Sequence, residues 1–419
     1  MVRFQVIEMP ETLTEGNGGF LSGFKVILGV TASISVYRVP DLIRDMRREG
    51  AIVRVVPSEE ALELVGKKVF QWASGEDVIH DITGRIEHVS EFEGESDSTV
   101  FAVVPATHNF IGKASSGVAD DAPSLFFSYA AGNGNPIVIS PAMHEAMFYN
   151  PIMRKNLEAL EEIGVTVIPP KMEDGKAKIE ENRIIEDYIC RAARGRILAG
   201  KTILIIGGGT AEPLDAVRGI QNNSTGVTAY WLARTSFIYG AERIVYIGNC
   251  SQELPPYVHL VEASTTAEFE KVSLDSIRIY KPDAVFLPAA LSDFNVPAVS
   301  DGKLDSALAH TVELKPRPKL INKLRKATKA LIVAFKLTES RTKDSDKIEN
   351  LGQYADMVVV NEIGIQSNPF GEGKKRYWIR KDKEETEMNL TKKELSARLL
   401  EFIAADLEVR DIESNGSSE

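Results

Sequence analysis

The chain has 419 residues, 26% of them charged, and a formal net charge of −11. This length predicts two domains of about 200 residues each rather than one core. The acidic balance argues against a broad nucleic-acid footprint, although a local nest of backbone N–H groups can still hold a small anion such as phosphate.

Cysteine content and hydropathy exclude further classes. The two cysteines, Cys190 and Cys250, rule out a disulfide framework and disfavour a cysteine-based zinc site. No apolar run reaches the length of about eighteen residues that spans a bilayer, and the first twenty residues contain acids and no apolar signal core. We therefore expect a cytoplasmic protein that binds neither membrane nor nucleic acid, with residues 1–22 as a loosely held extension.

Strands and helices alternate along the first half of the chain. Continuous apolar runs are typical of strands covered on both faces of a parallel sheet. The strands are predicted over residues 25–30, 51–56, 100–104, 136–140 and 165–168. A helix predicted from about 151 to 163 joins the last two, and this alternation predicts a doubly wound sheet.

The second half restarts the same pattern after a charged helical stretch at 180–200, where we place the domain junction. Its strands are predicted over residues 201–206, 244–247, 284–287, 331–334 and 357–360. The expected architecture is therefore two doubly wound, Rossmann-like α/β domains, over 23–190 and 191–409. The final residues, 410–419, are polar and are expected to be disordered.

Polar residues follow several strands of the first half. Thr31 and Ser33 follow the first strand, Thr107 follows a second, and His144 follows a third, while His88 precedes a strand. Since the carboxyl ends of parallel strands share one edge, we expect these residues to converge on one crevice. A plain turn with a serine cap is the alternative for the first loop. The lack of a G-x-G-x-x-G motif disfavours a standard NAD site.

This half resembles the flavin-containing cysteine decarboxylases, the family of phosphopantothenoylcysteine decarboxylase. The matching segments are GVTASIS at 29–35, HVSE at 88–91, VPATHN at 104–109 and GVADD at 117–121. The resemblance implies a flavodoxin-like fold with bound FMN and with His88 as the catalytic acid/base near the substrate sulfur. The FMN-lining residues that it implies are Gly29, Thr31, Ser33, Ser58, Thr107 and Asn109.

Two positions depart from the pattern of that family. Its substrate clamp P-x-M-N-x-x-M has His144 in place of the asparagine, and a histidine can still donate to a carboxylate, with a pH dependence. Its flap G-x-A-C-G has Lys178 in place of the cysteine acid. A lysine can act as an acid if burial shifts its pKa, whereas the alternative is a solvated loop.

A second constellation begins at Gly207, directly after a strand. The glycines of GGGT at 207–210 allow backbone N–H groups to approach an anion, and a second polar loop, QNNSTG, follows at 221–226. No G-K-[ST] follows, so this is not a Walker loop. Two polar loops separated by a charged segment are hard to explain as packing alone.

This stretch closely resembles the signature of the phosphopantothenate–cysteine ligases, and the domain order matches their fusion with the decarboxylase. Further matches are AALSDF at 289–294, GKL at 302–304, LKPRPKL at 314–320, AFKLTE at 334–339 and DMVVVN at 356–361. The resemblance implies activation of a carboxylate as an acyl nucleotide, which the amine of cysteine then attacks. It also implies Mg²⁺ and a nucleotide, either CTP or ATP.

The ligase resemblance also implies site residues. Asn222 and Lys303 are the candidate catalytic residues, and Lys303 is the expected cation for the phosphoryl oxygens. The implied nucleotide-binding residues are Gly208, Gly209, Ala289, Asp293, Lys303, Pro318, Lys319, Leu320, Ile321 and Phe335. The family commonly has two lysines seven and three positions before the strand aspartate, and here these are Glu349 and Gln353. Lys343 and Lys347 are nearby and are candidate substitutes.

The leading hypothesis is an enzyme that converts 4′-phosphopantothenate and cysteine to 4′-phosphopantetheine for coenzyme A synthesis. One alternative keeps the ligase and makes the flavin domain degenerate. Another is a regulatory binding protein, and the intact ligase motifs count against it. The resemblance also implies a homo-oligomer, either a dodecamer or a trimer of dimers.

Overall fold

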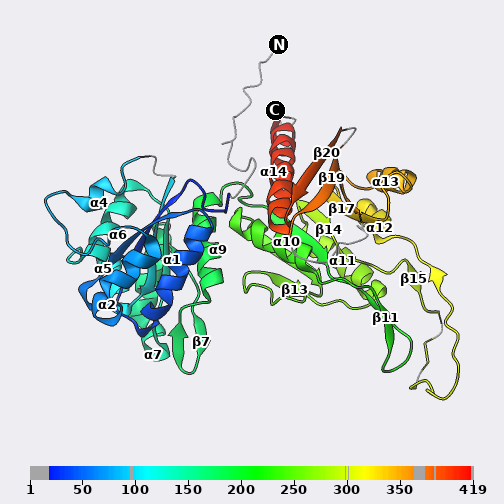
Figure 1. The fold of residues 1–419 in the computed structure, drawn as a ribbon, viewed down its shortest axis with the longest axis horizontal. Coiled ribbons are helices and arrows are strands. Elements are labelled where there is room, and N and C mark those ends of the chain that lie inside the picture. The colour runs from blue at the N-terminus through cyan, green and yellow to red at the C-terminus, as the bar shows by residue number, and fades with distance from the viewer. Residues whose placement is uncertain are drawn as a thin grey trace, which may run out of the picture. The chain divides into compact units, whose positions relative to one another are not determined.

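The computed structural model describes residues 18–94, 98–297, 299–300, 302–362, 373–381 and 384–416, with side chains up to residue 413. The chain forms two compact units, Met1–Gly195 and Arg196–Glu419 (Figure 1). The division falls five residues after the predicted junction at 190, because the helix that contains Cys190 belongs as a whole to the first unit. Each unit has its own sheet.

The first unit is built on a five-stranded parallel sheet with the order β2-β1-β3-β4-β6. Its strands are β1 (Lys25–Val30), β2 (Ile52–Pro57), β3 (Thr99–Ala106), β4 (Ile137–Pro141) and β6 (Thr166–Val167). All five predicted strands are confirmed. Strand β3 is buried along its whole length, as expected for a central strand covered on both faces.

Helices cover both faces of this sheet. They are η1 (Ile34–Arg38), α1 (Val39–Arg48), α2 (Glu59–Leu64), α3 (Lys67–Ser74), α4 (Glu87–Ser90), α5 (His108–Ser116), α6 (Ala122–Asn133), α7 (Glu145–Phe148), α8 (Pro151–Glu162) and α9 (Asn182–Arg194). Helix α9 contacts β3 and β4 and also packs on α1, whereas α6 contacts β1, β2 and β3 and packs on α5. A small antiparallel sheet, β5 (Met143–His144), β8 (Lys176–Lys178) and β7 (Lys171–Glu173), completes the unit.

The start of the described chain is packed rather than loose. Phe20 and Leu21 are buried, and the N–H of Leu21 donates to the carbonyl of Glu49 over 2.9 Å. The prediction of a loosely held extension is therefore wrong for residues 18–22, because two apolar side chains there join the core. Residues 1–17 of that predicted extension lie outside the described residues.

The second unit has an eight-stranded sheet with the order β13-β12-β9-β14-β17-β18-β19-β20. The first six strands are parallel, and β19 and β20 extend the sheet as an antiparallel hairpin. The strands are β9 (Thr202–Gly207), β12 (Arg243–Gly248), β13 (His259–Val261), β14 (Ala284–Leu287), β17 (Leu331–Thr338), β18 (Met357–Glu362), β19 (Lys375–Lys381) and β20 (Glu384–Leu390). The five predicted strands are again confirmed.

Helices and two short hairpins surround this sheet. The hairpins are β10 (Ala211–Pro213) with β11 (Gly219–Gln221) and β15 (Phe294–Asn295) with β16 (Lys315–Pro316). The helices are α10 (Val227–Ile238), α11 (Thr266–Tyr280), α12 (Leu320–Ala327), α13 (Ser345–Gly352) and α14 (Lys392–Gly416). Helix α14 packs on α10 and continues through residues 410–416. The prediction of a disordered tail is thus wrong for that stretch, because the helix of the last predicted domain does not end at 409.

Candidate functional sites

Hydroxyl side chains gather at the carboxyl edge of the sheet in the first unit. The Thr31 hydroxyl donates to the carbonyl of Pro105 over 2.7 Å and accepts from the N–H of Thr107 over 3.0 Å. Thr107 caps α5 by accepting from the N–H of Phe110, and Ser58 caps α2 in the same way. Since these hydroxyls fix the turns, three helix N-termini, those of η1, α2 and α5, open at one edge of the sheet.

This edge matches the chemistry that FMN requires. Backbone N–H groups at helix N-termini favour a phosphate, and Asn109, exposed in the first turn of α5, offers an amide. The exposed side chains of Ile34 and Tyr37 provide apolar surface at the same edge. Gly29 has a packing reason instead, because an added Cβ would lie 3.1 Å from Cγ2 of Val103. The other predicted FMN residues therefore lie on one edge of the sheet, whereas Gly29 allows β1 to pack closely beside Val103 in β3.

The clamp and the flap are two parts of one small sheet. Met143 pairs with Ala177, and His144 pairs with Lys176, so the strand that holds His144 lies beside the flap strand that holds Lys178. Asp174 and Gly175 both have positive φ values, 52° and 68°, as a tight two-residue hairpin turn requires. His144 is exposed and lies directly before α7.

The flap lysine is paired on the surface of this hairpin. The Lys178 ammonium lies 2.8 Å from the carboxylate of Asp174 and 3.2 Å from that of Glu173. Hydrogen bonds to these two carboxylates raise the pKa of Lys178. An acid tuned by burial would need a lowered pKa, so this geometry favours the solvated-loop alternative for Lys178.

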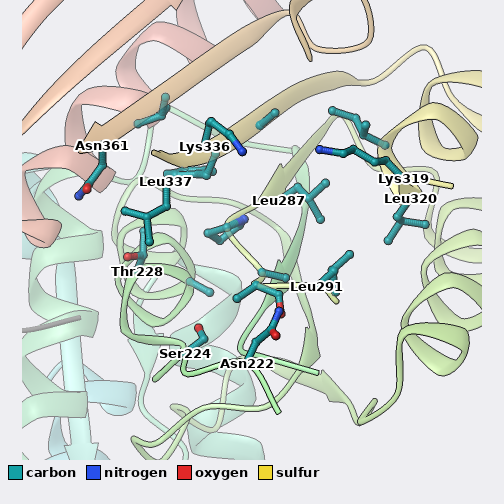
Figure 2. A pocket seen from close by; sticks show the side chains of 18 of the residues that line it. Asn222, Ser224, Thr228, Leu287, Leu291, Lys319, Leu320, Lys336, Leu337 and Asn361 are labelled. Carbon is teal, nitrogen blue, oxygen red and sulfur yellow. The ribbon is translucent and has the colours of Figure 1, made fainter. Parts of the chain in front are cut away.

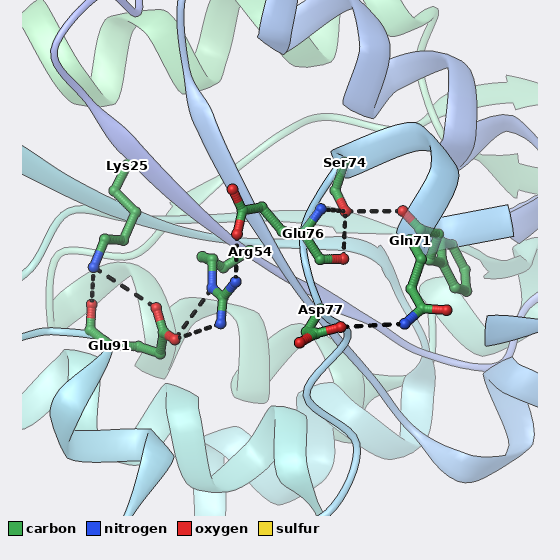
Figure 3. Close-up of polar contacts among 8 residues, drawn as sticks. Lys25, Arg54, Gln71, Ser74, Glu76, Asp77 and Glu91 are labelled. Atoms are coloured by element: carbon green, nitrogen blue, oxygen red, sulfur yellow. Dashed lines mark hydrogen bonds and ion pairs between the residues drawn. The ribbon is translucent and has the colours of Figure 1, made fainter. Parts of the chain in front are cut away.

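His88 does not lie at the carboxyl edge. It belongs to α4, and Glu91 at the end of that helix contacts the opposite edge of the sheet. The Glu91 carbonyl accepts from the ammonium of Lys25, the first residue of β1, and its carboxylate accepts from Arg54 in β2 over 2.8 Å (Figure 3). Figure 1 accordingly shows α4 at the end of the unit opposite to α2 and α7. The predicted convergence of His88 on the crevice is therefore wrong within one chain.

His88 nevertheless has a distinct environment. It lines an open hollow of about 450 Å³ beside α6, and its ring meets that of Tyr129 edge to face with centroids 6.2 Å apart. Its Nδ1 atom is buried and has no hydrogen-bond partner in the part of the chain that the structure describes. A buried ring nitrogen left without a partner is unfavourable unless a ligand or another chain satisfies it.

In the second unit, the glycine loop after β9 is shaped by close backbone contacts. Gly208 has a φ of 84°, and an added Cβ would lie 2.2 Å from the carbonyl oxygen of Asn249. An added Cβ at Gly209 would lie 2.6 Å from the carbonyl oxygen of Asn222. The Asn249 amide binds both polar backbone groups of Gly209, at 2.8 and 3.1 Å. The glycines therefore let three loops meet with no side chain between them.

The same loop positions Asn222. Its N–H donates to the carbonyl of Thr210, and its side-chain amide donates to the carbonyl of Ala290 over 3.0 Å. The Ala290 N–H in turn donates to the carbonyl of Gly208 over 2.8 Å. These bonds fix the side chain of Asn222 at the carboxyl end of β9 and β14, and its second amide N–H can donate to a ligand.

The charged turn of the ligase signature has a structural role. Asp215 accepts hydrogen bonds from the backbone N–H groups of Leu304, Val217 and Arg218, and these bonds lower the pKa of its carboxyl. Arg218 donates to the carbonyl of Leu304 over 2.9 Å. The two side chains thus attach the loop that follows Gly302. Lys303 in that loop is exposed.

A cavity of about 440 Å³ lies at this edge of the second unit (Figure 2). Among the predicted residues, it is lined by Asn222, Ala289, Asp293, Pro318, Lys319, Leu320, Ile321 and Phe335. Gly208, Gly209 and Lys303 do not line it in the described structure. The Gly208 carbonyl accepts from the N–H of Ala290, which lines the cavity, whereas Lys303 is not among the lining residues.

Several lining residues were not predicted from the sequence. They include Thr228, Arg317, Lys336, Asn361, Tyr377 and Lys392. Tyr377 and Asn361 are direct partners in β19 and β18, and burial raises the pKa of Tyr377 to about 12. The sequence could have indicated Lys336 as a site residue, since it directly follows the predicted nucleotide-binding residue Phe335. No sequence pattern indicated Tyr377 and Lys392, because they lie in and directly after the β19–β20 hairpin, which was not predicted from the sequence.

Two features are absent from the residues that the structure describes. No group of three or more His, Cys, Asp or Glu side chains could hold a metal ion there. No helix among those residues is both long and apolar enough to cross a membrane.

Comparisons with known proteins match both units. The flavoprotein family matches residues 17–194, and the C-terminal domain of the DNA/pantothenate metabolism flavoproteins matches residues 198–407. The coenzyme A biosynthesis bifunctional protein CoaBC of Thermococcus kodakarensis is 32% identical, over 91% of this chain and 95% of its own. That of Methanocaldococcus jannaschii is 31% identical, over 94% and 97%. The solved C-terminal domain of a CoaBC protein has 24% identity and a TM-score of 0.42, and it covers 51% of this chain and 98% of its own.

Proposed function

This chain belongs to the family of the coenzyme A biosynthesis bifunctional proteins, and on that premise we propose that it catalyses two successive reactions. The second unit joins cysteine to 4′-phosphopantothenate, and the first unit decarboxylates the resulting 4′-phosphopantothenoylcysteine to 4′-phosphopantetheine. The observation that carries the proposal is the cavity of the second unit, which brings the residues of five separate ligase motifs to one place.

The ligase step begins with the substrate carboxylate. Its oxygen attacks the α-phosphorus of the nucleotide, pyrophosphate leaves, and the amine of cysteine then displaces the nucleoside monophosphate with loss of a proton. Negative charge develops on the phosphoryl oxygens, so fixed cations and amide donors that face them lower the barrier. Asn222, held by its bond to Ala290, is the donor at the acyl-nucleotide. Asp293 lines the same cavity and is the candidate contact for Mg²⁺ or the ribose.

The decarboxylation uses the carboxyl edge of the first unit. FMN, when bound, supplies the two-electron chemistry that makes loss of CO₂ from the cysteine moiety easy. Ser33, Ser58 and Asn109 would hold its polar groups, while Thr31 and Thr107 fix the turns beneath them. His144 donates to the substrate carboxylate, and His88 is the acid/base for the sulfur-bearing end of the substrate.

The separation of His88 from the FMN edge favours an oligomer. Within one chain, α4 lies at the amino edge of the sheet and the FMN residues at the carboxyl edge. A catalytic His88 therefore has to meet the FMN edge of another copy. This supports a homo-oligomer in which contacts between flavin units complete each decarboxylase site, as a dodecamer or a trimer of dimers.

The test is a coupled assay of the full chain with 4′-phosphopantothenate and cysteine, in parallel with CTP and with ATP, and with mass analysis of the product. Formation of 4′-phosphopantetheine with one of the nucleotides is the expected result. Accumulation of 4′-phosphopantothenoylcysteine without release of CO₂ would instead establish an active ligase with a degenerate flavin domain. The pairing of the half-buried Lys178 with Asp174 and Glu173 is the observation that favours this alternative. No product with either nucleotide would refute the proposal.

A further inference from the structure

The cavity of the second unit is basic although the chain as a whole is acidic. Among its lining residues, Arg317, Lys319, Lys336 and Lys392 are basic and Asp293 is acidic, in a chain of net charge −11. Such a local excess of cations concentrates anionic ligands and binds them most strongly where the wall excludes water.

Two of the lysines face each other across open space. Figure 2 shows the ammonium ends of Lys336 and Lys319 turned toward one another from β17 and from the residue before α12. Neither has an ion-pair partner within 4.0 Å among the described residues. Burial, and after it the charge of Lys319, lower the pKa of Lys336. Two unneutralised ammonium groups turned toward each other are unfavourable until an anion lies between them.

The start of α12 adds to this positive field. The helix spans Leu320–Ala327, and its N-cap residue, Lys319, makes no side-chain capping bond. Leu320 and Ile321, the first residues of the helix, line the cavity. Because an uncapped N-terminus presents backbone N–H groups and a partial positive charge, it reinforces the two lysines as a phosphate site.

The ligase resemblance implies two lysines in the segment before β18, and this chain has none at those two positions. The corresponding residues, Glu349 and Gln353, are exposed and do not line the cavity. Lys347 was a candidate substitute, but its ammonium lies 2.7 Å from the carboxylate of Asp344, and this pair raises the pKa of Lys347. Lys343 is exposed and lies outside the cavity wall as well. Of Lys336, Lys343 and Lys347, only Lys336 lines the cavity as the structure describes it.

We propose that Lys336, with Lys319 opposite it, binds the β- and γ-phosphates of the nucleotide. This inference rests on the proposed use of a nucleotide triphosphate. The two ammonium groups neutralise the phosphates that leave as pyrophosphate, while Asn222 acts at the carboxylate that is being activated. Lys336 is thus a binding residue for the leaving group.

The test compares nucleotides that differ in their number of phosphates. Dissociation constants of CTP, CDP and CMP, and of the adenine series if the protein prefers ATP, are measured by calorimetry on the full-length protein and on Lys336→Gln. Loss of a charge-assisted contact predicts about tenfold to hundredfold weaker binding of the triphosphate. The monophosphate lacks the β- and γ-phosphates, so its dissociation constant should change by less than about threefold.

Two further variants complete the experiment. Lys336→Arg keeps a cation and should bind the triphosphate within about threefold of the original protein. Lys347→Gln removes a neighbouring lysine that is already paired and should leave all constants unchanged. Equal weakening of tri- and monophosphate by Lys336→Gln, or no weakening of either, would overturn the inference. Failure of the unaltered protein to bind CTP or ATP would instead refute the proposed nucleotide dependence.

Discussion

Each unit has its candidate site at the carboxyl edge of its own parallel sheet, but the polar side chains at the two edges differ in how far they are already paired. In the first unit, the hydroxyls of Thr31, Thr107 and Ser58 are already bonded to backbone groups and serve to hold turns. In the second unit, glycines let the loops touch, and Lys319 and Lys336 remain without ion-pair partners among the described residues. The hydrogen bonds of the first edge are therefore formed without a ligand, whereas we expect an anion to neutralise the two lysines of the second edge.

The largest effect should come from His88, which tests whether the first unit is catalytic at all. His88→Asn removes the acid/base group and should lower release of CO₂ from 4′-phosphopantothenoylcysteine by about 10²- to 10⁴-fold. Pyrophosphate production by the second unit should remain, because His88 belongs to the other unit. Both rates are measured on the same preparation.

A matched control is available for this change. His80→Asn alters a surface histidine that contacts Asp81 and Lys67, and both activities should be kept. Decarboxylation that persists in His88→Asn would show that the acid/base lies elsewhere, and would remove the argument that an oligomer is needed to bring His88 to the FMN edge.

The next effect concerns the donor at the edge of the second unit. Asn222→Asp keeps the shape of the side chain but replaces the amide donor that bonds to Ala290 with a carboxylate. We expect ligase turnover to fall by about 10²- to 10³-fold, as for the loss of one oxyanion donor. Decarboxylation of supplied 4′-phosphopantothenoylcysteine should be unchanged. A normal ligase rate in this variant would place the donor on another residue.

The glycine loop offers a test of stability. In Gly208→Ala the new Cβ would meet the Asn249 carbonyl oxygen at 2.2 Å in a left-handed conformation, so we expect a loss of about 3 kcal/mol or more. Gly200→Ala is the control, because Gly200 has a φ of 73° but nothing within 4 Å. It should lose only about 1 kcal/mol. Urea denaturation measures both, and equal losses would show that the close approach at Gly208 is relaxed in solution.

The smallest effect is a pH dependence of nucleotide binding. Burial and Lys319 lower the pKa of Lys336, while Asp344 and Asp293 raise it and Lys347 lowers it further. The contribution of Lys336 is therefore present at low pH and lost as the pH rises through its lowered pKa, by at most about tenfold per pH unit. Lys336→Arg should remove this alkaline fall. An identical profile in that variant would assign the fall to another group.

The sequence predicted both sheets well because their strands are buried on two faces and read as continuous apolar runs. The β19–β20 hairpin escaped prediction, since β20 is exposed along most of its length and carries little apolar pattern. The motifs placed most cavity residues correctly in the second unit. Lys303 does not line that cavity, and His88 does not lie at the carboxyl edge of its sheet, because a motif records which residue occurs but not where its loop lies.

The flap of the first unit is attached both at its tip, where the Gly175 carbonyl accepts from the N–H of Glu145 over 3.0 Å, and at its base. The Arg38 guanidinium donates to the carbonyls of Ile179 and Glu180, and the Asn182 amide donates back to the carbonyl of Arg38 over 3.2 Å. Most of these bonds are made to backbone atoms, so the flap keeps its position whichever side chain occupies residue 178. Residue 178 should therefore tolerate substitution without a change in the backbone of the flap. Lys178→Cys is one substitution away.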